Sequence, residues 1–131
     1  FSKALELAPQ FILAHLNRGR TYLRLSRFED SLQDFTKAIE LKGDDHFFWY
    51  CRAAAYANLN KKDAAISDLN QALALNPTDV PSYIARADIF FSLQKLAEAG
   101  ADYRRILTLR PDAEFAKKRL LKIETAPASK P

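Results

Sequence analysis

A chain of 131 residues, with 48% apolar and 27% charged residues, is long enough for one domain with a hydrophobic core, and its composition excludes a disordered protein. Its single cysteine, Cys51, excludes an internal disulfide, and no apolar run approaches the roughly 18 residues of a membrane span. The formal net charge of +4 comes from the two ends, because residues 44–77 hold 3 basic against 4 acidic residues. A groove that follows a nucleic acid is basic along its length, so we expect no nucleic-acid binding.

The sequence repeats itself with a period of 34 residues. Within each period the apolar residues twice follow the three-and-four spacing of a buried helical face, which predicts two helices. The connection between these helices is short, so each period is predicted to be an antiparallel helical hairpin. The columns that show the period most clearly are Leu7, Leu41, Leu75 and Leu109; Tyr22, Tyr56 and Phe90; and Pro9, Gly43, Pro77 and Pro111.

In chain order, residues 1–9 match the second helix of a repeat, so we expect the natural protein to continue upstream. Three full hairpins are then predicted at residues 10–43, 44–77 and 78–111. The Pro or Gly column is predicted to end each second helix, with Gly43 in a left-handed conformation. Asp45 and Asp79 stand where the next helices need an N-cap.

Residues 112–124 are predicted to form a last helix that caps the final hairpin. One apolar stripe on this helix covers the core face that a final repeat would otherwise expose. Its cations are predicted to face water. The stripe is Ala116, Leu120 and Ile123, and the cations are Lys117, Lys118, Arg119 and Lys122. Residues 125–131 are predicted to be disordered, so the single folded domain spans residues 1–124.

The middle hairpin carries an aromatic residue, a small residue and a second aromatic residue at Trp49, Ala53 and Tyr56, and it closes at Pro77. This pattern recurs three times at an interval of 34, and it resembles the tetratricopeptide repeat, a helix-turn-helix unit of the same length. The resemblance covers residues 1 to about 111. It implies an all-α, right-handed superhelix in which the first helices line a concave groove and the second helices form the convex back.

One column departs from the family pattern, because arginine stands where the family has leucine. Each of these arginines is followed 16 residues later by an aspartate, and the hairpin turn lies midway between the two. We therefore predict three partly buried ion pairs that fix the register of the hairpins; a ligand-binding ladder of cations is the alternative. The predicted pairs are Arg18–Asp34, Arg52–Asp68 and Arg86–Asp102.

The residues that carry catalytic or metal chemistry are sparse. His15 and His46 do not stand at metal-ligand spacing from each other or from Cys51. His15 shares a column with Trp49 and Tyr83, which favours a packed ring over a catalytic base. With 3 glycines the chain has no phosphate-binding loop, so we expect no catalysis, no metal and no cofactor.

Residues 46–52 read HFFWYCR and hold four adjacent rings. At 100° per residue Phe47 and Tyr50 share one face of their helix, whereas Trp49, helped by Phe48, is predicted to belong to the core. Phe47 and Tyr50 would then line the groove that the resemblance implies, unless a tightly wound superhelix or upstream repeats cover them. A contiguous apolar strip with arginines is typical of a binding site. The predicted groove residues are Leu13, Leu16, Asn17, Arg20, Leu23, Phe47, Tyr50, Ala54, Ile84, Asp88 and Phe91.

The predicted function is a non-catalytic scaffold that binds a partner protein's peptide or helix in this groove. Chaperone-tail binders of the family use a two-carboxylate clamp of Lys, Asn and Arg side chains. Asn17 matches the clamp's asparagine, but Phe47 and Cys51 stand where its basic residues are expected. We therefore expect an apolar peptide with an acidic group near Arg20 or Arg24.

Two alternatives from other classes stay open at this point. An apolar edge around Phe1, Ala4 and Leu5 could pair with a second copy of the chain, which would make it a self-assembly module. A helical-repeat scaffold could also bind RNA, and its association would then depend strongly on salt. The sequence indicates no cellular compartment.

Overall fold

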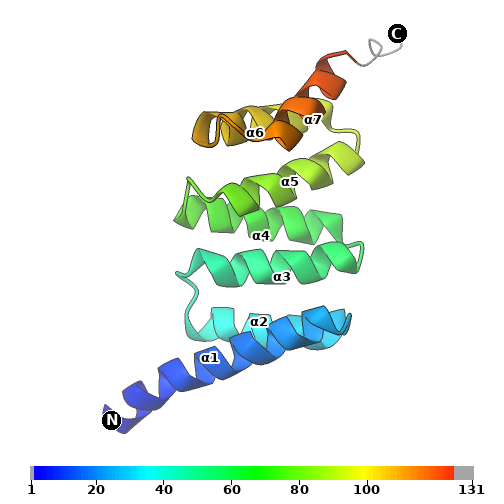
Figure 1. Ribbon diagram of the computed structural model, residues 1–131. Helices are drawn as coiled ribbons and strands as arrows, with labels where there is room; N and C mark the ends of the chain where they lie inside the picture. Colours follow the sequence, from blue (N-terminus) through cyan, green and yellow to red (C-terminus); the bar gives the residue numbers. More distant parts are fainter. Residues whose placement is uncertain (1, 126–131) are drawn as a thin grey trace. The chain divides into compact units, whose positions relative to one another are not determined.

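The computed structural model describes the backbone of residues 2–125 and the side chains of residues 9–125. Every regular element in this part of the chain is an α-helix, which confirms the predicted all-α fold class (Figure 1). The helices are α1 (Ser2–Arg24), α2 (Phe28–Leu41), α3 (His46–Asn58), α4 (Lys62–Leu75), α5 (Val80–Ser92), α6 (Leu96–Leu109) and α7 (Glu114–Glu124).

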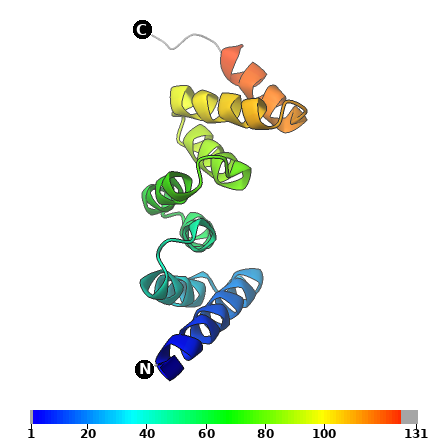
Figure 2. The ribbon, with the colours of Figure 1, turned by 90° about the vertical axis from the view of Figure 1, so that its left-hand side faces the viewer.

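The helices fall into two compact units, of which the first ends at Pro77 and the second begins at Thr78. In the first unit α1 packs on α2, α2 on α3, and α3 on α4; Figure 2 shows α1 lying beside α2 and the loop that leads from α2 into α3. In the second unit α5 packs on α6, and α6 on α7. The single domain over residues 1–124 stays a prediction, and residues 126–131 of the predicted disordered tail lie outside the described part of the chain.

The turn inside each hairpin uses a left-handed residue that is not glycine. Ser26, Asn60 and Gln94 each have φ of 61°. After Ser26, the Arg27 amide donates to the Tyr22 carbonyl at 2.8 Å, and the other two turns close in the same way. This closure satisfies the carbonyls at the end of the first helix. Our expectation of a left-handed Gly43 is wrong, because none of the glycines that the structure describes has positive φ.

The expected helix end at Pro9 is also absent, since α1 runs through this proline from Ser2 to Arg24. A proline inside a helix costs about 3 kcal/mol, because it lacks an amide donor and crowds the carbonyl four residues back. Asp45 and Asp79 start α3 and α5 by accepting backbone amides. The same column holds Phe11 inside α1 and Ala113, which precedes α7 without a side-chain cap, so an N-cap alone does not decide where a helix breaks.

The core of each hairpin pairs a small residue of the first helix with a large residue of the second. Gly19 of α1 faces the fully buried Phe35 of α2, and a Cβ atom on Gly19 would lie 2.6 Å from Phe35 Cε1. This contact explains why position 19 holds glycine and not a residue with a Cβ atom. The same two columns are buried in the other hairpins, at Ala53 and Leu69 and at Ala87 and Tyr103.

The predicted ion pairs are confirmed in all three hairpins. Arg52 Nε donates to Asp68 Oδ2 at 2.8 Å and its Nη2 donates to Oδ1 at 2.9 Å, a two-bond arrangement that Arg18–Asp34 and Arg86–Asp102 repeat. All three aspartates are buried. The hydrogen bond with Asp68 raises the pKa of Arg52, so the guanidinium stays charged.

Aromatic rings flank these arginines. The Arg52 guanidinium carbon lies 5.2 Å from the Trp49 ring centroid and 5.6 Å from that of Tyr56, which is cation–π geometry. Trp49 is half-buried and donates from Nε1 to the Gly43 carbonyl at 2.9 Å, while Phe48 is the more deeply buried ring. The two aromatic columns therefore pack against the arginine and help to hold it in place.

The first hairpin has a histidine in the column of Trp49. His15 is half-buried, and its Nδ1 lies 3.0 Å from Asp34 Oδ1, so it meets the aspartate that Arg18 also binds. Burial alone would raise the pKa of the Asp34 carboxyl, but the hydrogen bonds from Arg18 and His15 together lower it below its ordinary value. His15 is thus a packed structural ring, as its column predicted.

Candidate functional site

The predicted groove residues of α1 and α3 come together in the first unit. Leu16 and Leu23 of α1 and Phe47 of α3 are half-buried and pack against one buried cluster. This cluster consists of Phe35, Cys51 and Ala55. Since residues from two helices share one support, they form a continuous surface, called here the α1–α3 surface. It comprises Leu16, Arg20, Leu23, Phe47 and Tyr50.

The centre of the α1–α3 surface is a stack of one cation and two rings. The Arg20 guanidinium carbon lies 5.5 Å from the Phe47 ring centroid. The Phe47 and Tyr50 rings lie 6.2 Å apart at an interplanar angle of 24°. Arg20 is exposed, and no carboxylate of the described residues lies within ion-pair distance of it. The stack therefore presents a positioned positive charge beside two aromatic faces.

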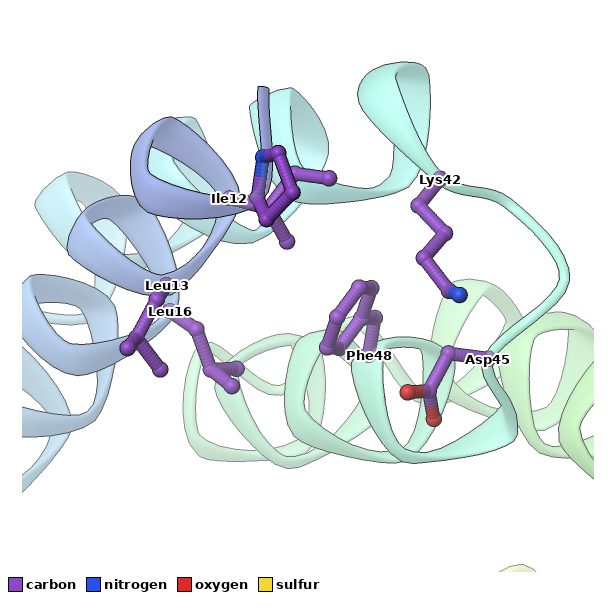
Figure 3. A pocket seen from close by; sticks show the side chains of 7 residues that line it. Ile12, Leu13, Leu16, Lys42, Asp45 and Phe48 are labelled. Atoms are coloured by element: carbon purple, nitrogen blue, oxygen red, sulfur yellow. The ribbon is translucent and has the colours of Figure 1, made fainter. Parts of the chain in front are cut away.

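A pocket of about 500 Å³ adjoins this stack (Figure 3). Figure 3 shows Ile12, Leu13 and Leu16 on its α1 side, with Lys42 and Asp45 on the opposite side and the Phe48 ring between them. Leu16 belongs to both the pocket and the α1–α3 surface. The lining residues are Pro9, Ile12, Leu13, Leu16, Lys42, Asp45 and Phe48.

The polar groups of the pocket differ in what they can do. Asp45 accepts the Phe47 backbone amide at 3.0 Å, so its carboxylate is occupied as the N-cap of α3. Lys42 lies at a long 3.9 Å from the exposed Asp44, a contact that water can replace. The pocket can therefore take an apolar side chain, and Lys42 is available to an anionic group at its edge.

Sequence reasoning missed Ile12, Lys42 and Phe48 as site residues. Phe48 is 5% exposed, in agreement with the prediction that it is core, yet its ring also forms a pocket wall. The pocket exists where α1 passes the loop between α2 and α3. The spacing of residues along one helix cannot predict this pocket, because the pocket forms between segments that are separate in the sequence.

The other predicted residues of the first unit have lesser roles. Leu13 is 55% exposed and lines the pocket beside the α1–α3 surface. Asn17 is exposed, and Ala54 is half-buried with its carbonyl accepting the Asn58 side-chain amide at 2.8 Å. Cys51 is 4% exposed, and burial raises the pKa of its thiol to about 12, so it is a packing residue and no nucleophile.

The third-hairpin residues belong to the second unit, so whether they continue the α1–α3 surface stays a prediction. Ile84 packs on the buried cluster around Tyr103, and Phe91 lies under the Arg119 guanidinium at 4.4 Å. Asp88 accepts the Tyr103 hydroxyl at 2.5 Å. Burial and this hydrogen bond both raise the pKa of Tyr103. Asp88 therefore satisfies a buried hydroxyl, a role that the sequence did not indicate.

Metal clusters and membrane-spanning helices are absent from the part of the chain that the structure describes. Residues 2–125 contain no group of three or more His, Cys, Asp or Glu side chains that could hold a metal ion. Within the same residues, no helix combines the length and the apolar character needed to cross a membrane.

Comparison with known families identifies the repeats. Models of the tetratricopeptide repeat match residues 12–45, 47–79 and 80–113. The chain belongs to the tetratricopeptide repeat family. The matched ranges start two or three residues after the predicted hairpins, which begin at residues 10, 44 and 78.

Solved tetratricopeptide repeat domains have the same fold. The first such domain of Spaghetti (RPAP3), bound to the HSP90 peptide SRMEEVD, has a TM-score of 0.84 and 34% identity, over 89% of this chain and 93% of that chain. The second domain of human RPAP3, in complex with the HSP70 peptide SGPTIEEVD, has a TM-score of 0.81 and 26% identity, over 89% and 98% of the two chains. The domain of Arabidopsis OM64 has a TM-score of 0.83 and 25% identity, over 89% and 97%.

One enzyme shares a short stretch with this chain. A UDP-N-acetylglucosamine–peptide N-acetylglucosaminyltransferase of Giardia intestinalis is 47% identical over 45 residues, which is 34% of this chain and 3% of the enzyme. Such a short stretch transfers no catalytic activity. The comparisons also give no support to self-assembly, and the edge predicted for it, Phe1, Ala4 and Leu5, has side chains outside the described residues.

Proposed function

We propose that this chain is a scaffold that binds a peptide of a partner protein on the α1–α3 surface and in the pocket beside it. The observation that carries the proposal is the stack of Arg20, Phe47 and Tyr50: a cation that no carboxylate of the described residues pairs with lies over the Phe47 ring, which stacks with Tyr50. A few hot-spot residues dominate the energy of protein interfaces, and Trp, Tyr and Arg are enriched among them. The RPAP3 domains, which are bound to peptides, support the same kind of function.

The chemistry of the surface indicates the chemistry of the peptide. The pocket is lined mainly by apolar side chains, so it suits a large apolar residue. Arg20 and Arg24 have no carboxylate partner among the described residues, so either guanidinium could pair with an acidic residue of the peptide. We therefore propose a ligand that carries a large apolar residue close to an aspartate or glutamate.

A carboxylate clamp is not part of this proposal. Phe47 is a ring in the stack, and Cys51 is buried against Ala55, so neither position supplies the basic side chain that a clamp would need. Recognition in the proposed mode uses internal side chains of the peptide. It does not require a free C-terminal carboxylate.

A selection from a library of random dodecapeptides, displayed on phage and captured on the immobilised chain, tests the proposed ligand chemistry. We expect the enriched peptides to share a large apolar residue within a few positions of an aspartate or glutamate. Amidation of their C-termini should change the affinity less than threefold, as measured by fluorescence anisotropy. Enrichment of peptides without acidic residues, or a tenfold loss on amidation, would contradict the proposed mode.

A further inference from the structure

Helix α7 carries four residues on one face that its role as a cap does not use. Phe115, Lys118, Arg119 and Lys122 follow the i, i+3, i+4, i+7 spacing of a single helical stripe. The apolar stripe of Ala116, Leu120 and Ile123 faces the core of the second unit instead. We predicted that the cations of α7 face water, and the contacts of Arg119 show that this is wrong for one of them.

Arg119 is half-buried, and its guanidinium carbon lies 4.4 Å from the Phe91 ring centroid of α5. A guanidinium this close to a ring face is in cation–π contact, which holds the cation in place. Phe115 keeps 42% of its surface exposed one turn away. Together, Phe115, Lys118, Arg119 and Lys122 line a shallow pocket of about 280 Å³.

The carboxylates near this stripe have other partners in the described part of the chain. Glu114 binds the neighbouring Lys117 at 3.2 Å, and Glu124 lies 3.9 Å from Arg104. Asp88 of α5 accepts the Tyr103 hydroxyl. Within the described residues, Lys118, Arg119 and Lys122 therefore have no carboxylate at ion-pair distance. Three cations and an exposed ring on one stripe attract an anionic partner.

We propose that this α7 stripe is a second binding site, and that its occupant is an acidic peptide segment with an aromatic or large apolar residue. Carboxylates of the segment would pair with Lys118, Arg119 and Lys122, and its apolar residue would pack on Phe115. The proposal is independent of the α1–α3 surface, because every residue that it uses lies in the second unit.

Two other anionic partners fit the observations less well. The cations of the stripe fall within five residues, roughly 6 Å of helix axis, whereas a nucleic-acid backbone needs a longer basic track. A membrane surface is attracted by larger clusters of four to eight cations with apolar residues on the same face. On α7 the 61%-exposed Leu121 does not share the stripe.

Fluorescence anisotropy of the labelled peptide EEEFEEE, with QQQFQQQ as its uncharged counterpart, tests the proposal. The full chain is compared with Lys118→Glu/Lys122→Glu and with a control of equal charge change, Lys61→Glu/Lys95→Glu, which alters two exposed turn lysines. Each form is also measured with Phe47→Ala/Tyr50→Ala, so that binding at the α1–α3 surface is removed. Circular dichroism verifies that each variant is folded.

In the background without the α1–α3 site, we expect EEEFEEE to bind, QQQFQQQ not to bind, and Lys118→Glu/Lys122→Glu to weaken EEEFEEE at least tenfold. The control variant should change the affinity less than twofold, and Phe115→Ala should weaken it about threefold. An equal loss in the control would reduce the effect to bulk charge and overturn the proposal. Tighter, Lys118- and Lys122-dependent binding of a dT20 oligonucleotide or of vesicles with 30% phosphatidylserine would overturn the choice of partner.

Discussion

Substitution of Asp68 by alanine is expected to lower the free energy of unfolding by about 3 kcal/mol. Asp68 is 3% exposed and accepts two hydrogen bonds from Arg52, whose side chain is 17% exposed. Removal of the carboxylate strands a guanidinium between Trp49 and Tyr56, which it cannot leave without exposing both rings. The loss should lie at the lower end of the usual range for broken buried pairs, because the guanidinium still reaches water.

Urea denaturation of Asp68→Ala, Arg52→Ala and the double variant measures this effect and the coupling between the two residues. Arg18→Ala is the matched comparison from the first hairpin. It should cost less than Arg52→Ala, because His15 still meets Asp34 and because the Arg18 side chain is already 61% exposed. Zero coupling between Arg52 and Asp68, or equal losses in the two hairpins, would contradict this account of the ion pairs.

Substitution of Phe35 by alanine is expected to cost about 3–5 kcal/mol of unfolding free energy. Phe35 is fully buried, and it shares one cluster with Cys51 and Ala55 beneath the α1–α3 surface. The cavity would border Gly19, whose missing side chain leaves the space that the ring occupies. Thermal unfolding followed by circular dichroism should show the loss as a lower midpoint temperature.

The contact between Gly19 and Phe35 allows a sharper version of this test. Gly19→Ala should cost about 1–3 kcal/mol in the natural background, because its Cβ would lie 2.6 Å from the ring. In a Phe35→Leu background the same change should cost nothing or stabilise the helix, since alanine has the better helix propensity. An equal cost of Gly19→Ala in both backgrounds would show that the ring is not the obstacle.

The 34-residue period predicted most of the fold because two residues that contact each other in one hairpin recur at the same positions in the next. Arg52 and Asp68 recur at a constant separation around each turn, so their pairing followed from the position of the turn alone. The turn positions were equally predictable. The residues that adopt the left-handed conformation were not, because Ser26, Asn60 and Gln94 share no side-chain chemistry that favours it.

The aligned positions of the repeats predicted neither the continuous helix α1 nor the pocket. Pro9 fills the column that follows the ends of the other second helices, yet α1 continues through it. Helical spacing placed Phe47 and Tyr50 on one face, and the structure brings them together with Arg20. The pocket beside them requires α1 to pass the α2–α3 loop, which is a property of tertiary packing.

We claim above all that Phe47 and Tyr50 bind a partner peptide, and that the helices stay folded without these two rings although Phe47 packs on the buried cluster. The most direct test is the affinity of a library-selected peptide for the natural chain, for Phe47→Ala/Tyr50→Ala, and for Leu25→Ala, a control that removes a 62%-exposed apolar side chain elsewhere on the first unit. Isothermal titration calorimetry should show a loss of at least about 30-fold for the double variant, as expected for interface hot spots, with helical content kept and the control within twofold. An unchanged affinity in the folded double variant would contradict the claim.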